Sequence, residues 1–247
     1  MGKVALVTGG AKGIGAAIVK ELASCGHDVV INYLTSQEEA EVLANKFSSE
    51  YGVKVLTFKC DVSKENQVDE MVKFIESKLG GVDVLINNAA IDLSSMWHEK
   101  KAEDVRKTLD VNVVGAYNVA RRVSNHMMDN QWGRIINISS TNGINTYYPM
   151  CVEYDASKAA LISLTHNLSV EFAPYVTVNA IAPGFIGTES ELQGYDEEFL
   201  KSEEEKILVG RYGKPEEVAK LVNFLVSDDA AYINNSVIRI DGGQYGA

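Results

Sequence analysis

The chain has 247 residues, of which 46% are hydrophobic, and a formal net charge of -11. This length and apolar content suit one domain with a sizeable core, so we expect a single domain over residues 1–247. The acidic balance argues against a nucleic-acid partner and against an anionic membrane surface. No segment reaches the roughly 18 consecutive apolar residues of a membrane span, and the first residues lack a signal-peptide pattern, so we expect a cytoplasmic protein.

The sulfur and imidazole side chains exclude two further classes. Cys25, Cys60 and Cys151 are odd in number and widely spaced, and no histidine cluster accompanies them. We therefore predict neither a disulfide framework nor a metal site. The four histidines occur without a Gly-x-Ser-x-Gly element, which disfavours a serine hydrolase.

Short, β-branched apolar runs alternate with amphipathic stretches along the chain. Seven runs predict strands, at residues 3–8, 28–33, 54–60, 82–87, 133–139, 176–182 and 236–241. Most are continuously apolar, as expected of strands buried on both faces of a parallel sheet. The order predicts an α/β fold, a doubly wound seven-stranded parallel sheet with helices on both faces. The acidic stretch at about 185–212 interrupts this rhythm, and we expect a lid-like insertion there.

A glycine-rich turn, TGGAKGIG, follows the first predicted strand. Gly9 and Gly13 let the backbone turn tightly, and a helix starts at about Ile14. The amino end of that helix offers unpaired N–H groups and a positive dipole end to a pyrophosphate. The spacing is neither that of a Walker A loop nor G-x-G-x-x-G. We predict a dinucleotide site, the alternative being a glycine-rich turn without a ligand.

Two more strand ends fit the same ligand. Asp61, followed by Val62, ends the third strand, where a carboxylate can reach an adenine amino group; alternatively, Asp61 caps the helix that opens near Ser63. Asn88 and Ala89 follow the fourth strand in the segment INNAA, which alone is equally compatible with a simple turn.

The end of the second strand favours NADP(H), although NAD(H) stays open. NAD-binding folds usually place an acid there to bind the ribose hydroxyls. Here Asn32 and Tyr33 occupy this edge, and the first acid is Glu38, inside the next helix. Lys12 in the glycine turn supplies a cation for a 2′-phosphate; alternatively, it is a solvated surface lysine.

Six motifs occur in a fixed order: TGGAKGIG, NNAA, INISS, YDASK, NAIAPG and IDGG. Together they resemble the short-chain dehydrogenase/reductase family over roughly residues 3 to 243. Within this family the chain is most similar to bacterial 3-oxoacyl-(acyl-carrier-protein) reductases. The resemblance implies a Rossmann-type domain that transfers hydride between a nicotinamide and a carbonyl or alcohol, and a homotetramer built on helices around 100–130 and 154–173 and on the C-terminal segment.

The resemblance also implies roles for particular residues. Tyr154 matches the proton donor, Lys158 the family's lysine, Ser140 the serine near the substrate oxygen and Asn112 the residue that holds a relay water. The nicotinamide carboxamide is expected against a loop that contains Pro183, Gly184, Ile186 and Thr188.

Simple chemistry fits these roles. Tyr154 and Lys158 lie four residues apart, on one face of a helix, and the lysine cation is expected to lower the tyrosine's pKa. Ser140 can steady the carbonyl oxygen that hydride attack makes negative. Alternatively, Ser140 is a plain strand-end cap and Asn112 a polar residue inside a helix.

The chain departs from the carrier-protein reductases in three places. Ser140 and Tyr154 are 14 residues apart, about one residue more than in those reductases, and Ala90 ends NNAA where glycine is usual. Basic residues that attract an acidic carrier protein are missing before the fifth and sixth strands, apart from Arg134.

The missing cations make a free hydrophobic ketone or alcohol, such as a hydroxysteroid, the rival substrate. Tyr147, Tyr148 and Cys151 are expected to line its pocket. A more remote alternative is a non-catalytic NADP-binding sensor, which would need the glycine turn but no acid.

Overall fold

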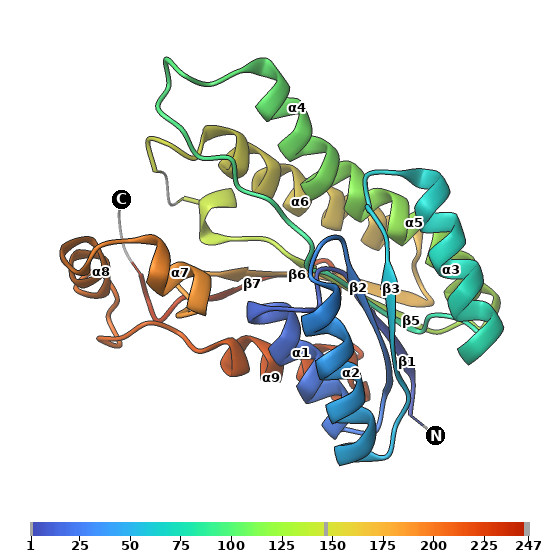
Figure 1. Cartoon of the computed structure of the whole chain (residues 1–247). Coiled ribbons are helices and arrows are strands. Elements are labelled where there is room, and N and C mark those ends of the chain that lie inside the picture. Colours follow the sequence, from blue (N-terminus) through green and yellow to red (C-terminus); the bar gives the residue numbers. More distant parts are fainter. Residues whose placement is uncertain (1, 146–147, 245–247) are drawn as a thin grey trace.

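The computed structural model describes residues 2–145 and 148–244. Its centre is a parallel sheet of seven strands in the order β3-β2-β1-β4-β5-β6-β7 (Figure 1). All seven predicted strands are confirmed within two residues at each end. They are β1 (Val4–Val7), β2 (Asp28–Tyr33), β3 (Val55–Lys59), β4 (Val84–Asn87), β5 (Gly133–Ile138), β6 (Val176–Pro183) and β7 (Val237–Ile240).

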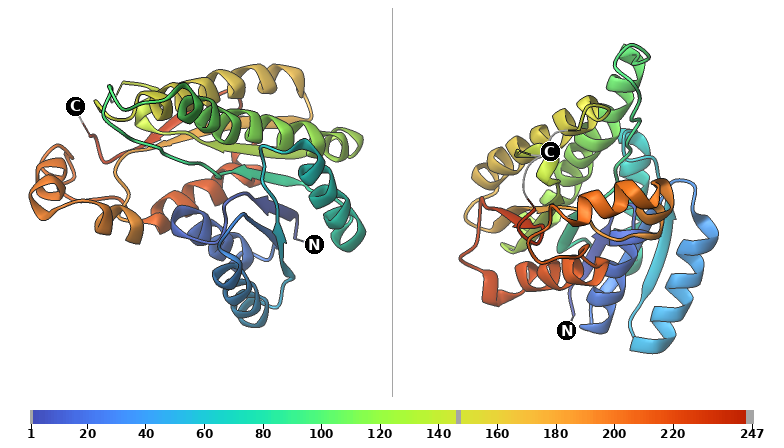
Figure 2. Two further views of the ribbon diagram at one scale, coloured as in Figure 1. Left: turned by 45° about the horizontal axis from the view of Figure 1, so that its top comes forward. Right: turned by 90° about the vertical axis from the view of Figure 1, so that its left-hand side faces the viewer.

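Helices cover both faces of the sheet (Figures 1 and 2). On one face pack α1 (Gly13–Ser24), α2 (Gln37–Tyr51) and α9 (Pro215–Val226). On the other pack α3 (Glu65–Leu79), α5 (Ala116–Asp129) and α6 (Val152–Glu171), and α4 (Ala102–Leu109) lies against α6.

Alternate residues of one strand serve the two cores. Ala5 and Val7 of β1 join the core under α1, whereas Val4 and Leu6 join the core under α3 and α5. Because successive strand side chains point to opposite faces, a strand buried on both sides is apolar at most of its positions. This explains the continuous apolar runs in the sequence.

The interrupted stretch after β6 contains two short helices, α7 (Glu189–Gly194) and α8 (Glu197–Glu204). In Figures 1 and 2 they stand out beyond the end of the sheet. The remaining elements are the π-helical turn η1 (Asp110–Gly115) and the 3₁₀ turns η2 (Thr141–Gly143) and η3 (Asp228–Ala230). Within the part of the chain that the structure describes, no helix combines the length and apolar character needed to cross a bilayer.

Candidate active site

The glycine turn after β1 has the backbone that the sequence predicts. Gly9 and Gly13 have φ angles of 61° and 53°, in the left-handed region that favours glycine. A Cβ atom on Gly15 would lie 2.3 Å from the carbonyl oxygen of Gly9, so no larger residue fits there. Helix α1 begins at Gly13, one residue before the predicted start, and no side chain caps its amino end. Its first N–H groups are therefore available to an anion.

Asn88 holds this turn from the end of β4. Its side-chain amide donates 3.0 Å hydrogen bonds to the carbonyl oxygens of Thr8 and Gly9. The backbone N–H groups of Asn88 and Ala89 both donate to the Thr8 hydroxyl at 3.0 Å. The NNAA segment is thus more than a simple turn, because it fixes the glycine turn from the neighbouring strand.

Asn32 holds the same turn from the other side. Its Oδ1 accepts from the Gly9 N–H at 3.3 Å, and its Nδ2 donates to the Cys60 carbonyl at 2.9 Å. Tyr33 lies in the hydrophobic core under α1 and is only 8% exposed. The end of β2 therefore carries no carboxylate of its own, as predicted.

Lys12 is neither a free cation nor simply solvated. Its Nζ lies 2.7 Å from Oε1 of Glu39, in the first turn of α2. Both side chains are about half exposed, at 64% and 46%. Hydrogen bonding to Lys12 is the main cause that lowers the pKa of Glu39. An acid therefore reaches this edge of the site from a helix, where the sequence suggested that none would.

Asp61 is held by a local turn. Its Oδ1 accepts from the Ser63 backbone N–H at 3.0 Å and from the Ser63 hydroxyl at 2.7 Å. Helix α3 begins later, after Lys64, so the alternative that Asp61 caps this helix is wrong. Val62 is buried, and its side chain leaves no room for a Cβ on Gly115 of η1.

Asn112 lies in η1, the π-helical turn between α4 and α5. Its Oδ1 accepts from the Ile91 N–H at 2.8 Å, and its Nδ2 donates to the Ile91 carbonyl and to the Ser157 hydroxyl, both at 2.9 Å. The side chain thus ties the loop after β4 to α6. Because its amide atoms are already used in this way, a water held here would bind a backbone carbonyl that the π-helical turn releases.

Ser140 follows β5 and caps η2, where its hydroxyl accepts from the Asn142 N–H at 3.2 Å. The cap role that the sequence left open is therefore real. The Ser140 hydroxyl also lies near Tyr154, whose pKa it lowers by hydrogen bonding.

Tyr154 and Lys158 both lie on α6, and the ammonium is 5.4 Å from the centre of the phenol ring. Lys158 donates to the Ile138 carbonyl at 2.8 Å, and burial lowers its pKa to about 8. The pKa of Tyr154, however, is raised, first by burial and then by the charges of Asp92 and Glu191. Burial and these two acids therefore act against the lowering that is expected from the Lys158 cation.

The predicted carboxamide loop follows β6. Pro183 is the last residue of β6, and the N–H of Gly184, the first residue after the strand, donates to the Ile240 carbonyl at 3.1 Å. Ile186 is buried and pairs with Gly213 in an isolated bridge. The Thr188 hydroxyl caps α7, and its Cγ2 would lie 3.3 Å from a Cβ on Gly13. The loop thus lies against the glycine turn.

Tyr148 was predicted to line the substrate pocket, but its hydroxyl contacts the segment after β6. It donates to Oε2 of Glu203 in α8 at 2.6 Å, and Glu203 is buried. The Tyr148 ring meets the ring of Phe185 edge-on at 6.1 Å. Cys151 lies just before α6, with its Sγ 3.2 Å from the Ser94 hydroxyl. Tyr147 lies outside the described residues.

Sequence reasoning missed the acids on the substrate side. Asp92 and Glu191 influence Tyr154 from the loop after β4 and from α7, and Glu203 anchors Tyr148. In the sequence, Glu191 and Glu203 belong to an acidic stretch and have no distinguishing pattern. Only Asp92, two residues after NNAA, stood at a strand end where a functional acid could have been suspected.

A glycine turn that leaves helix N–H groups open and a Ser–Tyr–Lys group fit a nucleotide-dependent oxidoreductase. Residues 9–244 match a family model described as enoyl-(acyl carrier protein) reductase. The chain belongs to the short-chain dehydrogenase/reductase family of NAD(P)-dependent oxidoreductases.

Several relatives match nearly the whole chain. An acetoacetyl-CoA reductase of Rhizobium meliloti is 42% identical, covering 99% of each protein. Glucose 1-dehydrogenase 2 of Bacillus subtilis is 36% identical, covering 98% of this chain and 94% of the relative. A short-chain dehydrogenase/reductase from Serratia marcescens has the same fold, with a TM-score of 0.92, 37% identity and 98% of each chain covered.

Proposed function

We propose that this protein is a cytoplasmic, NADPH-dependent reductase that converts a ketone reversibly to a secondary alcohol. The observation that carries the proposal is the proximity of Ser140, Tyr154 and Lys158 at the carboxyl ends of the central strands, the edge of the sheet that also carries the glycine turn. The matches to an acetoacetyl-CoA reductase and to 3-oxoacyl-(acyl-carrier-protein) reductases support the reaction type.

The residues at the strand ends fit a dinucleotide. The left-handed glycines, the absence of space at Gly15 and the uncapped start of α1 suit a pyrophosphate. Asp61 would hold the adenine, Lys158 the nicotinamide ribose, and the loop from Pro183 to Thr188 the carboxamide. Bound in this way, the nicotinamide supplies the hydride.

The protein's own groups provide the rest of the chemistry. Ser140 donates a hydrogen bond to the substrate carbonyl and so stabilises the negative charge that develops on its oxygen. Tyr154 gives its proton to that oxygen. Its raised pKa keeps the phenol protonated at neutral pH, which suits the reducing direction. The Lys158 ammonium stays mostly charged at pH 7, given its pKa of about 8, and supports the phenolate that is left.

The test is the Tyr154→Phe variant. We expect kcat for NADPH oxidation with the best ketone of a panel to fall about 100- to 10,000-fold, as for loss of a general acid. NADPH affinity, measured by fluorescence titration, should change little. Tyr175→Phe, at a 37% exposed position, serves as the control. Near-wild-type turnover in Tyr154→Phe would overturn the mechanism, and NADPH binding without turnover on any ketone would favour the sensor.

For the substrate, we propose a 3-oxoacyl thioester, with a free hydrophobic ketone as the second candidate. The reductases among the relatives favour the first. The acids Asp92 and Glu191 beside Tyr154 favour a substrate without negative charge near its carbonyl. A comparison of acetoacetyl-CoA, a carrier-protein thioester and hydroxysteroid ketones in the same assay separates the two.

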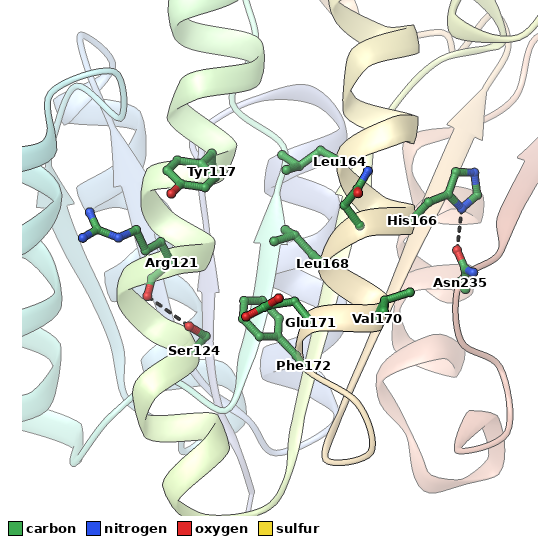
Figure 3. A pocket seen from close by; sticks show the side chains of 11 residues that line it. Tyr117, Arg121, Ser124, Leu164, His166, Leu168, Val170, Glu171, Phe172 and Asn235 are labelled. Atoms are coloured by element: carbon green, nitrogen blue, oxygen red, sulfur yellow. Dashed lines mark hydrogen bonds between the residues drawn. The ribbon is translucent and has the colours of Figure 1, made fainter.

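We also propose that the chain forms a homotetramer, as the resemblance implies. A hollow of about 760 Å³ lies between α5 and α6, with Leu164, Leu168 and Phe172 on its α6 side (Figure 3). Tyr117 and Val170 at this hollow are 45% and 73% exposed. A second copy would cover these apolar groups, and sedimentation velocity measures the resulting assembly directly.

A further inference from the structure

A buried ion pair lies beside the proposed proton donor. Nζ of Lys100 is 2.5 Å from Oε2 of Glu153, and the two side chains are only 6% and 0% exposed. Among the ion pairs of the described residues, no other has both side chains less than a tenth exposed. Lys100 also donates to the Met150 carbonyl at 2.8 Å. Within the described part of the chain, Oε1 of Glu153 is buried and finds no hydrogen-bond partner.

Stability alone does not account for such a pair. Removing two charges from water costs several kcal/mol per ion, and hydrophobic residues of similar size often stabilise a protein as well or better. The unpartnered Oε1 of Glu153 adds a further cost. A buried pair of this kind is better explained by what it fixes in space.

The pair joins two segments that build the site. Lys100 lies at the end of the loop between β4 and α4, and Glu153 is the second residue of α6, directly before Tyr154. Two further contacts link the same loop to α6 or to the residue directly before it. Asn112 bonds Ile91 of the loop and Ser157 of α6, and Ser94 contacts Cys151.

Among the described residues, the first turn of α6 has one other close side-chain anchor, the 2.7 Å hydrogen bond that Nδ2 of Asn142 donates to Oδ1 of Asp155. Cys151 at its N-cap position makes no side-chain cap hydrogen bond. Among the described residues, the loop between β4 and α4 adds one backbone contact next to this turn, from the Ser95 N–H to the Met150 carbonyl at 3.3 Å. Lys100 holds this turn at two points, since it bonds both Met150 before the helix and Glu153 inside it, and it alone of these side chains comes from the loop between β4 and α4.

We propose that Lys100 and Glu153 are positioning residues, which fix the first turn of α6 so that the Tyr154 hydroxyl stays in line with Ser140 and the substrate oxygen. The inference rests on the proposed role of Tyr154. A misplacement of about 1 Å in a reacting group can cost on the order of 100-fold in rate. The pair thus acts through Tyr154 and needs no contact with the substrate.

The test separates stability from positioning by replacing the whole pair. Lys100→Met alone should lower the melting temperature, because it leaves a buried, unpaired carboxylate. Lys100→Met/Glu153→Met removes both charges and should melt at or above the wild-type temperature. Its kcat with the best ketone of the panel should nevertheless fall at least about tenfold, with KM and the NADPH dissociation constant within about twofold of wild type.

The matched control is Glu76→Met/Arg122→Met, which removes a partly exposed pair between α3 and α5, away from the site. It should leave kcat unchanged. If the double variant at Lys100 and Glu153 does not fold, Glu153→Gln provides the second measurement. This near-isosteric variant replaces the ion pair with a weaker, neutral contact, so the hold on the first turn of α6 is reduced, and we expect a several-fold loss in kcat with KM unchanged.

A stable double variant with wild-type kcat would overturn the inference, as would a folded Glu153→Gln variant with wild-type kcat. The Tyr154→Phe variant, measured alongside, distinguishes this failure from failure of the proposed function. If Tyr154→Phe is inactive while the pair is dispensable, only the positioning inference fails. If Tyr154→Phe is fully active, the proposed function fails as well.

Discussion

The two ends of the site are built in different ways, although both lie at the carboxyl edge of one sheet. At the end proposed to bind the dinucleotide, short polar residues at the carboxyl ends of neighbouring strands hold the glycine turn through its backbone, as Asn32 and Asn88 do. At the substrate end, long side chains from separate segments hold one another. Tyr148 reaches Glu203 across 55 residues of chain, and Lys100 reaches Glu153 across 53.

This difference shows which part of a site can be predicted from a sequence. Backbone shape at the dinucleotide end depends on sterics at single positions, and glycine is the residue that meets them. Contacts at the substrate end depend on which segments the fold brings together, and many side-chain pairs could serve. The following variants test how sharply the two ends differ.

The largest effect is expected at the dinucleotide end, for Gly15→Ala. The added Cβ would lie 2.3 Å from the Gly9 carbonyl oxygen and 2.7 Å from the Asn88 amide nitrogen, so the turn must move. We expect the free energy of unfolding to fall by about 1–3 kcal/mol, as for overpacking. NADPH affinity, measured by fluorescence titration, should fall on the order of 100-fold.

Gly194→Ala, a glycine in α7 with nothing within 4 Å of an added Cβ, is the control and should bind NADPH normally. If Gly15→Ala bound NADPH as well as the wild type, the turn would tolerate rearrangement. The contrast between a sterically fixed end and an adaptable end would then fail.

The sequence predicted most of the fold and of the dinucleotide end for the same physical reason. Short, β-branched apolar runs between helical patterns indicate strands buried on both faces, and glycines directly after the first run indicate a tight turn. The seven strands, the parallel sheet and the positions of Gly9, Gly13 and Asn88 are all confirmed by the structure.

What the sequence could not give depends on contacts between distant segments. The direction of α2 brings Glu39 to Lys12, and the packing of α8 brings Glu203 to Tyr148. The raised pKa of Tyr154 has the same origin, because its burial and the nearness of Asp92 and Glu191 exist only in the folded chain. The sequence of an acidic stretch does not indicate which residue each carboxylate contacts in the folded protein.

A smaller effect on cofactor affinity is expected at Lys12 and Glu39, where a residue of the glycine turn pairs with a side chain from a separate helix. If Lys12 binds the 2′-phosphate of NADPH, Lys12→Ala loses a charge-assisted hydrogen bond, and NADPH affinity should fall about tenfold while NADH affinity stays constant. Glu39→Gln releases Lys12 from its 2.7 Å ion pair and should strengthen NADPH binding a few-fold, less so at high salt.

Lys20→Ala, an exposed lysine on α1, is the control for the change in net charge. Equal losses for NADPH and NADH in Lys12→Ala would show that Lys12 does not distinguish the cofactors. The preference for NADP(H) would then need another origin.

The smallest effect is expected at the substrate end, for Asp92→Asn. The groups that act on the Tyr154 hydroxyl are Asp92 from the loop after β4, Glu191 from α7, and Cys151, Ser140 and Lys158 around it. Burial is the first cause of the raised pKa and Asp92 the second, so removing this charge lowers the pKa of Tyr154 relative to the wild type.

The sign of the pH effect follows from the proposed role of Tyr154 in each direction. Alcohol oxidation needs the phenolate, and below the pKa its population rises as the pKa falls. Oxidation by Asp92→Asn should therefore be about threefold faster than wild type at pH 8, and its rising limb should move to lower pH. Glu189→Gln, an exposed acid on α7 that is not among the groups acting on Tyr154, should leave the profile in place. A profile for Asp92→Asn that does not move, or moves to higher pH, would mean that this acid does not act on Tyr154, and burial and the other neighbouring groups would then set its pKa.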